Sequence, residues 1–235
     1  MDTLYIVMPA YNEEESILGV VEQWYPILEG KSKDSRLVVA DFGSKDKTHQ
    51  ILEKLKNSQY PKLEILENDN QFHGPKVIAL YDYAIKNGAD YIFQTDSDGQ
   101  TNPDEFELFW QLRNEYEGIF GNRAVRGDGK KRAFVEKVVC FLLRTYFGVK
   151  VPDANAPFRL MRTSALKKYL YKLPTDYNLP NIMIVTYFSY YKERIIFKDI
   201  SFKPRMAGDN SVNFSKIIRI GWKALGEFKR LKSEI

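Results

Sequence analysis

The sequence predicts an α/β protein with a mostly parallel central sheet flanked by helices. Over residues 4–95, short apolar runs alternate with segments whose apolar residues recur every three or four positions. This alternation is typical of parallel sheets, because each helix returns the chain to the start of the next strand. Polar clusters follow three of the apolar runs. Proteins of this class bind ligands there, beyond the carboxyl ends of the strands.

Each early element has its own pattern. The strands are continuous apolar runs, as expected for strands buried on both faces. They are Leu4–Met8, Arg36–Asp41, Leu63–Leu66 and Tyr91–Thr95. The helices place apolar residues on one face. They are Glu14–Leu28, Asp46–Asn57 and Lys76–Asn87.

The pattern loosens after Pro103. Ala133–Phe147 is apolar almost all round, which favours a buried core helix, and the chain ends in an amphipathic helix. We therefore expect one domain over residues 1–212 and a basic amphipathic helix over 213–235. The other predictions for this part are a helix at Asp104–Arg113, a short strand near Ile119–Gly121, a basic loop at Arg123–Arg132 and strands at Phe158–Met161 and Ile195–Ile200.

The composition excludes several protein classes. Of 235 residues, 44% are hydrophobic and 14% aromatic, so the chain is neither disordered nor fibrous. The single cysteine, Cys140, excludes a disulfide framework and a cysteine-rich zinc site, and its apolar neighbours suggest a core position. Two histidines argue against a histidine-built metal site. This cysteine usage fits a reducing, cytoplasmic compartment. No signal peptide or membrane-spanning segment is predicted.

Charge is distributed unevenly. Residues 192–235 carry 11 Lys and Arg against 5 Asp and Glu, whereas the rest of the chain is nearly neutral. A basic tail on a neutral body suggests an anionic surface or ligand at one end. Nucleic acid is not the expected partner, because no known binding module is present and the basic residues are not interleaved with aromatic ones.

The most informative motif, Asp96–Gln100, directly follows the predicted strand Tyr91–Thr95. Two carboxylates separated by one residue, Asp96 and Asp98, can both turn toward a ligand as the chain leaves the sheet. Oxygen ligands of this kind suit Mg²⁺ or Mn²⁺ bridging the phosphates of a nucleotide. Gln100 adds a third, neutral oxygen.

Two alternatives compete with this metal site. Pro103 and Asp104 open a helix just afterwards, so the acids could be solvated residues of a helix cap. A calcium loop is the other alternative, with Glu107 as its last ligand. However, Thr101 occupies the glycine position of such a loop, and a strand rather than a helix precedes it.

Two further polar clusters follow strands. Pro9–Glu14 comes after the first strand, where Tyr11 offers a flat face for a base and Glu13 an acceptor for ribose or base edges. Asp41–Thr48 closes the second strand, and Asp41 could bind a base or ribose. Either cluster could instead be only a turn and a helix start.

Together these three segments resemble the family 2 glycosyltransferases with the GT-A (Rossmann-like) fold. The family patterns are a Pro-x-Tyr-Asn-Glu opening, an Asp-Asp-Gly-Ser-x-Asp-x-Thr turn and a strand-end Asp-x-Asp. Seven ordered matches span about residues 4–215. The four later ones are Gly74–Lys76, Gly121–Arg123, Asp153–Arg159 and Arg205–Ser211.

The Asp-x-Asp-x-Gln and late Arg-x-x-Gly segments particularly resemble polyprenyl-phosphate sugar transferases of the dolichol-phosphate mannosyltransferase type. The resemblance implies a metal-dependent, inverting transfer from a UDP- or GDP-sugar, with Asp98 and Asp153 as catalytic candidates. It implies donor contacts from Pro9, Tyr11, Glu13, Asp41, Lys76, Asp96, Ser97 and Arg205. It implies Mg²⁺ or Mn²⁺ at Asp96, Asp98 and Gln100, and an acceptor phosphate at Arg123 and Arg132.

The sequence departs from the family pattern at three places. Phe42 replaces the second aspartate of the turn, Ala156–Pro157 replaces Ser-Gly, and no Glu-Asp pair occurs near Tyr177–Ile182. A phosphate acceptor is already anionic and needs little deprotonation, whereas a sugar hydroxyl needs a base. The missing pair therefore favours a lipid-phosphate acceptor. If a base is required, Asp153 is the candidate; alternatively, it is a structural acid paired with Arg159.

Two other functions stay open at this point. One is a glycosyltransferase acting on a saccharide hydroxyl in capsule or lipopolysaccharide synthesis, and the other is a non-catalytic nucleotide-sugar-binding relative. The terminal helix could lie on an anionic bilayer or pack on the body with its basic face in water. We expect a cytoplasmic protein, peripheral on the inner face of a membrane, docking directly or through a membrane-protein partner.

Overall fold

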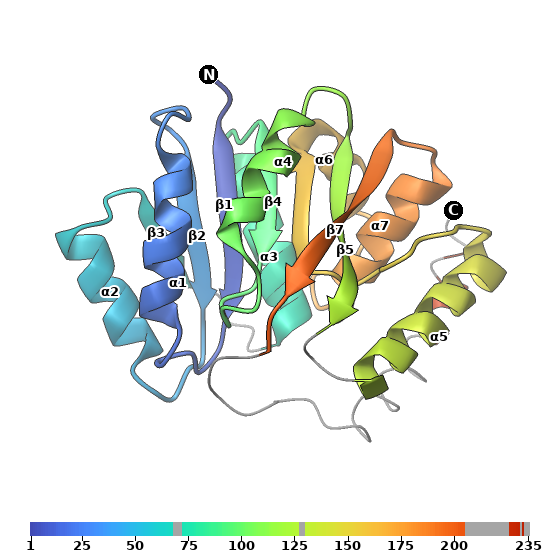
Figure 1. The fold of residues 1–235 in the computed structure, drawn as a ribbon, viewed down its shortest axis with the longest axis horizontal. Helices are drawn as coiled ribbons and strands as arrows, with labels where there is room; N and C mark the ends of the chain where they lie inside the picture. The colour runs from blue at the N-terminus through green and yellow to red at the C-terminus, as the bar shows by residue number, and fades with distance from the viewer. Residues whose placement is uncertain (68–71, 127–129, 205–225, 231, 233–235) are drawn as a thin grey trace.

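A seven-stranded mixed sheet with helices on both faces forms the centre of the computed structural model (Figure 1). The structure describes residues 1–67, 72–126, 130–204, 226–230 and 232. The strand order is β3-β2-β1-β4-β6-β5-β7. The strands are β1 (Leu4–Ala10), β2 (Arg36–Asp41), β3 (Leu63–Leu66), β4 (Tyr91–Thr95), β5 (Gly118–Arg126), β6 (Phe158–Arg162) and β7 (Ile195–Phe202).

The predicted mostly parallel sheet is confirmed, with one reversed strand. β3, β2, β1 and β4 pair in parallel, as do β5 and β7, whereas β6 runs antiparallel to both β4 and β5. Thr95, the last residue of β4, lies opposite Phe158, the first residue of β6. The segment that enters β6 therefore reaches the same edge of the sheet as the segments that leave β1, β2 and β4.

The helices agree with the predictions in the first half and add two elements in the second. α6 and α7 were not predicted. The helices are α1 (Ile17–Trp24), α2 (Thr48–Ser58), α3 (His73–Lys86), α4 (Phe106–Gln111), α5 (Lys130–Phe147), α6 (Thr163–Leu170) and α7 (Pro180–Tyr190). Short 3-10 helices cover Tyr25–Leu28 and Pro103–Glu105.

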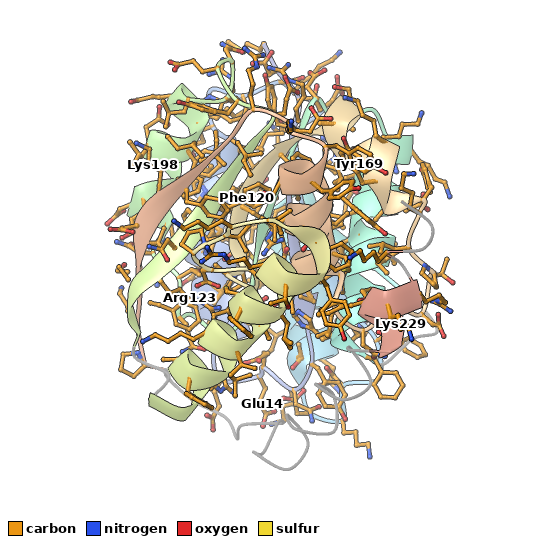
Figure 2. The ribbon with its side chains drawn as sticks, turned by 90° about the vertical axis from the view of Figure 1, so that its right-hand side faces the viewer. Glu14, Phe120, Arg123, Tyr169, Lys198 and Lys229 are labelled. Atoms are coloured by element: carbon orange, nitrogen blue, oxygen red, sulfur yellow. The ribbon has the colours of Figure 1, made fainter. Side chains whose placement is uncertain are left out.

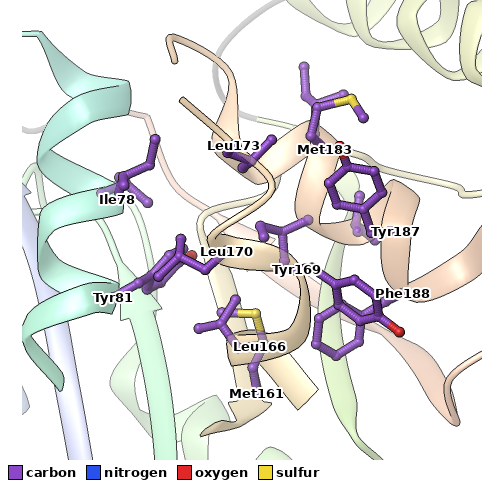
Figure 3. Close-up of a cluster of buried hydrophobic side chains, with 14 of the residues drawn as sticks. Ile78, Tyr81, Met161, Leu166, Tyr169, Leu170, Leu173, Met183, Tyr187 and Phe188 are labelled. Atoms are coloured by element: carbon purple, nitrogen blue, oxygen red, sulfur yellow. The ribbon is translucent and has the colours of Figure 1, made fainter. Parts of the chain in front are cut away.

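The core has two parts, one on each face of the sheet. α1, α2 and α4 cover one part, and α3, α5, α6 and α7 cover the other (Figure 3). Alternate residues of a strand serve opposite parts, as the pleat requires. In β1, for example, Ile6 and Met8 belong to the first part and Tyr5 and Val7 to the second.

The basic loop predicted at Arg123–Arg132 is largely wrong. β5 continues to Arg126, because its pairing with β7 extends to Arg126 opposite Phe202, with an irregularity between Asn122 and Val125. α5 then begins at Lys130. Long-range pairing decided this boundary, and no local pattern announced it.

α5 is not the buried core helix that its composition suggested. Leu143 and Phe147 are buried, but Phe134 is 65% exposed and Phe141 64% exposed. Figure 2, which faces α5, places the helix at the outside of the molecule. A helix that is apolar all round needs neighbours on every side, and here the described part of the body covers one side only.

The predicted terminal helix lies mostly outside the described residues, as does Arg205. Residues 226–230 are helical, and Phe228 is buried with its ring centroid 6.0 Å from that of Phe147. None of the helices in the described ranges combines the length and the hydrophobicity that crossing a bilayer requires.

Candidate active site

The three predicted motifs gather at one edge of the sheet. Ala10 at the end of β1 lies opposite Asp41 at the end of β2, and β4 is the other neighbour of β1. Since these strands are parallel, the segments that follow them meet at their carboxyl ends, at the bottom of Figure 1.

Hydrogen bonds join the segment after β1 to the one after β2. The backbone N–H of Asn12 donates to the Ser44 hydroxyl (3.0 Å), and that of Lys45 donates back to the Asn12 side chain (2.8 Å). The Glu13 N–H donates to the Thr48 hydroxyl (2.8 Å). Asn12 has a φ of 54°, a conformation that asparagine tolerates better than most residues. The two segments thus form one rigid unit.

Both acids of this unit are buried and already oriented. Asp41 is 3% exposed, accepts a hydrogen bond from the Ser44 hydroxyl and has His49 Nδ1 at 3.4 Å. Glu13 is 7% exposed and accepts from the Ser16 hydroxyl (2.9 Å). These carboxylates can therefore accept hydrogen bonds from a ligand without reorganising.

Ser97 ties the aspartate motif to the first strand. Its hydroxyl donates to the Pro9 carbonyl (2.9 Å), and its own carbonyl accepts from the Ser16 hydroxyl (3.1 Å). The position between the two aspartates is thus fixed against β1, which sets the direction in which both carboxylates leave the backbone.

Asp96 is the acid at this edge whose pKa is most strongly changed by its surroundings. Its Oδ1 atom is buried without a hydrogen-bond partner. Burial, with a smaller contribution from the charge of Asp98, raises the pKa of Asp96 to about 8. A carboxylate held this way gains from a cation, because a cation would compensate the buried charge.

Asp98 and Gln100 complete this segment. Asp98 Oδ1 accepts from the Gln100 N–H (3.1 Å), and Gly99 between them has a φ of 72°, which glycine adopts without strain. The Gln100 side-chain nitrogen donates to the Lys203 carbonyl (2.8 Å), and the Lys203 N–H donates back to the Gln100 carbonyl (2.8 Å). The motif is thereby fastened to the segment that follows β7.

These residues suit a magnesium-type site better than a calcium loop. Within the described ranges, no three His, Cys, Asp or Glu side chains group closely enough to hold a metal ion, which argues against Glu107 joining the two aspartates. Mg²⁺ is usually held by one or two carboxylates together with substrate phosphates and water. A site of two carboxylates at the edge where the three motifs meet fits that pattern.

Lys76, in the first turn of α3, lies almost fully buried beneath the first motif. It is 1% exposed, its Nζ donates to the Ala10 carbonyl (2.6 Å) and lies 5.3 Å from the centroid of the Tyr11 ring. Burial lowers the pKa of Lys76 to about 8, against the opposing effect of the Asp41 carboxylate. The lysine thus supports the position of Tyr11 while carrying a charge that is costly to bury.

Replacing Lys76 with methionine is expected to remove a component of the pH dependence of stability. Between about pH 8 and pH 10.5 the folded protein has lost this proton and the unfolded chain still binds it. The unfolding free energy of the wild type therefore rises with pH relative to the variant, by about 2–3 kcal/mol across this window. Urea denaturation at several pH values measures it, with Lys54→Met as the exposed control. Parallel profiles for wild type and Lys76→Met would contradict the assignment.

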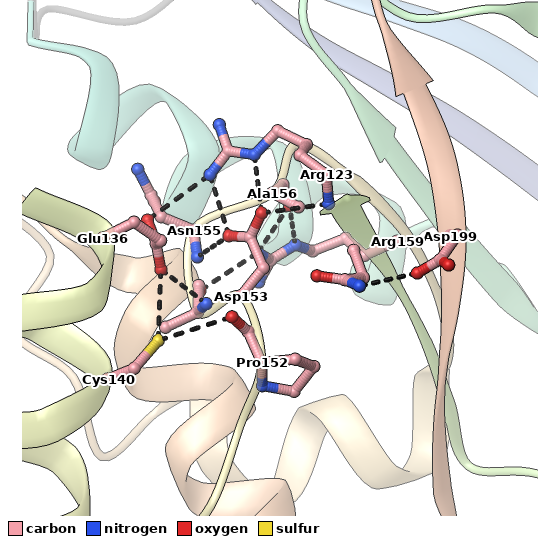
Figure 4. Close-up of polar contacts among 11 residues, drawn as sticks. Arg123, Glu136, Cys140, Pro152, Asp153, Asn155, Ala156, Arg159 and Asp199 are labelled. Atoms are coloured by element: carbon pink, nitrogen blue, oxygen red, sulfur yellow. Dashed lines mark hydrogen bonds and ion pairs between the residues drawn. The ribbon is translucent and has the colours of Figure 1, made fainter. Parts of the chain in front are cut away.

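Arg123 and Asp153, two residues singled out separately in the sequence, form a buried ion pair (Figure 4). Arg123 Nε donates to Asp153 Oδ2 (2.7 Å) and Nη2 to Asp153 Oδ1 (2.8 Å). Their side chains are 6% and 4% exposed. Arg123 lies in the second half of β5, and Asp153 lies in the segment that leads into β6. The guanidinium plane is thus fixed before any ligand arrives.

Glu136 of α5, which sequence reasoning missed, completes this cluster. It accepts from the Ala154 N–H (2.7 Å), and its other oxygen lies 3.4 Å from Arg123 Nη2. The Sγ atom of Cys140, one turn later, lies 3.6 Å from Glu136 Oε1, and Cys140 is partly buried. Burial raises the pKa of the Cys140 thiol to about 12, so this cysteine is an inert packing residue.

The alternative pairing of Asp153 with Arg159 is wrong. Arg159 is 1% exposed and donates to backbone carbonyls instead, at Ala156 (2.7 Å) and Asn181 (2.9 Å). It connects the segment before β6 to the start of α7. Arg132, the other predicted acceptor residue, lies in the first turn of α5 and is partly buried.

The sequence pattern of glycosyl transferase family 2 matches residues 5–170. The chain belongs to this family. This family 2 protein is 25% identical over 224 residues to the undecaprenyl-phosphate 4-deoxy-4-formamido-L-arabinose transferase of Photorhabdus laumondii, covering 94% of this chain and 66% of the relative. It is 28% identical over 186 residues to the UDP-N-acetylglucosamine–dolichyl-phosphate N-acetylglucosaminyltransferase of Methanococcus voltae, covering 70% and 71%.

Solved structures confirm the predicted GT-A fold for this glycosyltransferase-family chain. Glucosyl-3-phosphoglycerate synthase from Mycobacterium tuberculosis, in complex with Mn²⁺ and UDP-glucose, superposes with a TM-score of 0.72 at 17% identity, covering 99% of this chain and 79% of the synthase. The S. aureus TarS 1–349 structure with UDP-GlcNAc gives a TM-score of 0.59 at 17% identity, covering 93% and 65%.

Proposed function

We propose that this protein transfers a sugar from a nucleoside-diphosphate sugar to a polyprenyl phosphate, with inversion at the anomeric carbon. Family membership and the polyprenyl-phosphate acceptors in the names of both relatives support the reaction class. The observation that carries the proposal is the buried, unpartnered Oδ1 of Asp96 beside Asp98, at the edge that the nucleotide segments share. That arrangement supports a cation site, at which the diphosphate of the donor would bind.

The donor half of the site lies at the ends of β1, β2 and β4. Tyr11 would offer its ring to the base, and Asp41 and Glu13 would accept hydrogen bonds from base or ribose. Lys76, Pro9 and Ser97 would hold this surface in place through the backbone contacts described above. Arg205 is proposed to reach the diphosphate from the segment after β7.

Asp96, Asp98 and Gln100 would hold Mg²⁺ or Mn²⁺. When bound, the cation neutralises charge on the diphosphate leaving group. The chain itself contributes position: Ser97 fixes the direction of both carboxylates, and the Gln100–Lys203 hydrogen bonds bring the segment after β7 to the leaving group. Such positioning of groups before the reaction is a main source of catalysis in phosphate-linked transfers.

The acceptor half would be built from Arg123 and Arg132. Asp153 and Glu136 hold the Arg123 guanidinium in a fixed plane, and a fixed guanidinium suits a phosphate oxygen. A phosphate monoester is anionic and can attack the anomeric carbon without a base. In this proposal Asp153 positions Arg123 and takes no proton.

A saccharide hydroxyl is the second candidate acceptor, because Asp153 is a buried carboxylate at the correct edge. Its bidentate contact with Arg123 argues against that role, since accepting a proton would weaken the pair. We propose a cytoplasmic, membrane-peripheral location, either direct or through a membrane-protein partner, because the acceptors named for both relatives are lipids.

Calorimetric binding of UDP and GDP, each with and without Mn²⁺, tests the donor site. We expect one nucleotide to bind only with the metal. That nucleotide's sugars are then assayed for transfer to undecaprenyl phosphate and to free saccharides. Transfer to the lipid phosphate supports the proposal, and transfer to saccharides alone would replace it with the second candidate. Binding of both nucleotides without Mn²⁺ would contradict the metal-dependent donor site. Failure of both nucleotides to bind, with or without Mn²⁺, would contradict it as well.

A further inference from the structure

The outer face of α5 carries an apolar stripe that the described body does not cover. Phe134, Val138 and Phe141 follow one another at helical spacing and are 65%, 41% and 64% exposed. The opposite face carries Glu136 and Leu143, which contact the body. The helix is therefore two-sided, with polar and core contacts inward and large apolar side chains outward.

Basic residues border this stripe. Lys137, Arg144 and Lys150 are all exposed. Within the described part of the chain, Arg144 and Lys150 make no ion pair or side-chain hydrogen bond, and together with Cys140, Phe141 and Val151 they line a shallow pocket beside the stripe. Large apolar groups next to uncompensated cations are complementary to an anionic bilayer, whose headgroups bind the cations and whose interior accepts the aromatic rings.

We propose that the outer face of α5 is a docking surface for an anionic lipid bilayer. Phe134, Val138 and Phe141 would enter the interface, while Arg144 and Lys150 would bind lipid phosphates at its border. The proposal rests on the proposed function for its biological meaning, because a lipid-phosphate acceptor has to be reached at a membrane. Its physical basis is independent: the stripe, the cations and the pocket belong to α5 and to the residues that directly follow it.

The same helix connects this surface to the acceptor half of the site. Glu136 binds the Ala154 N–H and reaches Arg123 from the face of α5 opposite the stripe. Across a helix, this separation is about 10 Å. A bilayer bound to the outer face would therefore lie within the length of a few isoprene units of the Arg123–Asp153 pair. α5 would set the depth at which a membrane-bound phosphate meets the site.

Sedimentation with phosphatidylcholine vesicles, with and without phosphatidylglycerol, tests this surface. The wild type should bind the anionic vesicles, and Phe134→Ser/Phe141→Ser should weaken that binding by about tenfold or more. Leu18→Ser/Leu108→Ser is the matched control, because these leucines are 45% and 46% exposed on helices of the other sheet face. Equal binding by the wild type and the phenylalanine variant would overturn the proposal.

The charge contribution is tested separately. Arg144→Glu/Lys150→Glu should lose anionic-vesicle binding, whereas Lys54→Glu/Lys56→Glu, with the same change in net charge on α2, should keep most of it. Equal losses in both variants would mean a non-specific attraction and would overturn the assignment to α5. A phenylalanine variant that turns a dimer into a monomer in size-exclusion chromatography, with vesicle binding unchanged, would assign the stripe to a second copy.

A soluble short-chain prenyl phosphate separates this inference from the proposed function. The phenylalanine variant should transfer sugar to that acceptor at the wild-type rate, because its active site is untouched. Normal transfer with normal vesicle binding would overturn the docking surface alone. No transfer by the wild type to any prenyl phosphate would contradict the proposed function. The docking surface would then be judged from the vesicle-binding result alone.

Discussion

Replacing Asp96 with asparagine is expected to abolish metal-dependent nucleotide binding and, at the same time, to stabilise the free protein. The Oδ1 atom of Asp96 is buried without a partner, and Asp98 adds a second negative charge nearby. Removing the charge relieves this cost by about 2 kcal/mol, which corresponds to a rise in melting temperature of about 5 °C. Without the carboxylate, however, the proposed cation site loses one of its two acids.

Two comparisons make this result specific. Asp98→Asn should also lose metal-dependent binding, but with nearly unchanged stability, because this carboxylate is only partly buried and accepts a hydrogen bond from Gln100. Asp104→Asn, an exposed acid in the same region, should change neither property. Differential scanning fluorimetry and calorimetry with Mn²⁺ measure both. An Asp96→Asn protein that binds the nucleotide and Mn²⁺ like the wild type would remove the metal site from this edge.

Replacing Asp153 with asparagine is expected to be strongly destabilising, by about 3 kcal/mol. The variant removes the bidentate carboxylate that holds the buried Arg123 guanidinium and leaves the longer 3.4 Å contact with Glu136, and breaking one side of a buried ion pair costs more than the intact pair contributes. Removing both charges, in Arg123→Met/Asp153→Asn, should recover part of the loss. The control is Glu64→Gln, which alters a pair of similar length (3.0 Å) whose side chains are more than a quarter exposed, and it should cost less than about 1 kcal/mol.

The same variants identify the role of Asp153 in the reaction. If Asp153 positions Arg123, both Asp153→Asn and Arg123→Lys should raise KM for a phosphate acceptor and leave the pH profile of kcat unchanged in shape. If Asp153 is a base, Asp153→Asn should lower kcat and remove the acidic limb of that profile. The second result would favour a hydroxyl acceptor and contradict the proposed one.

The strand positions could be predicted from the sequence in the half of the fold where each strand is a continuous apolar run. β2, β3 and β4 have the predicted bounds, and β1 extends two residues further, to Ala10. Burial on both faces leaves such runs no polar positions, so their limits are visible in the sequence. α7 is the opposite case: it is buried all round, so its apolar residues show no helical period that could be recognised.

The site was predictable as motifs and not as contacts. Asp96, Asp98 and the segments after β1 and β2 were found because each follows a recognisable strand. The pairing of Arg123 with Asp153 joins residues 30 positions apart and depends on β6 running backwards beside β5. Glu136 gave no signal, since one acid in an apolar helix looks like a solvated residue until the helix is placed against the body.

The reversed direction of β6 divides the site into two parts of different origin. In the proposed function, residues that leave parallel strands form the donor part, and the segment between β5 and β6, an excursion that starts and ends at the same edge, contributes most of the acceptor part. Because the excursion begins and ends in adjacent strands, it can be exchanged between relatives without changing the path of the donor strands. On the proposed assignment of the two parts, chimaeras that join one relative's donor strands to another's excursion are expected to take donor specificity from the first relative and acceptor specificity from the second.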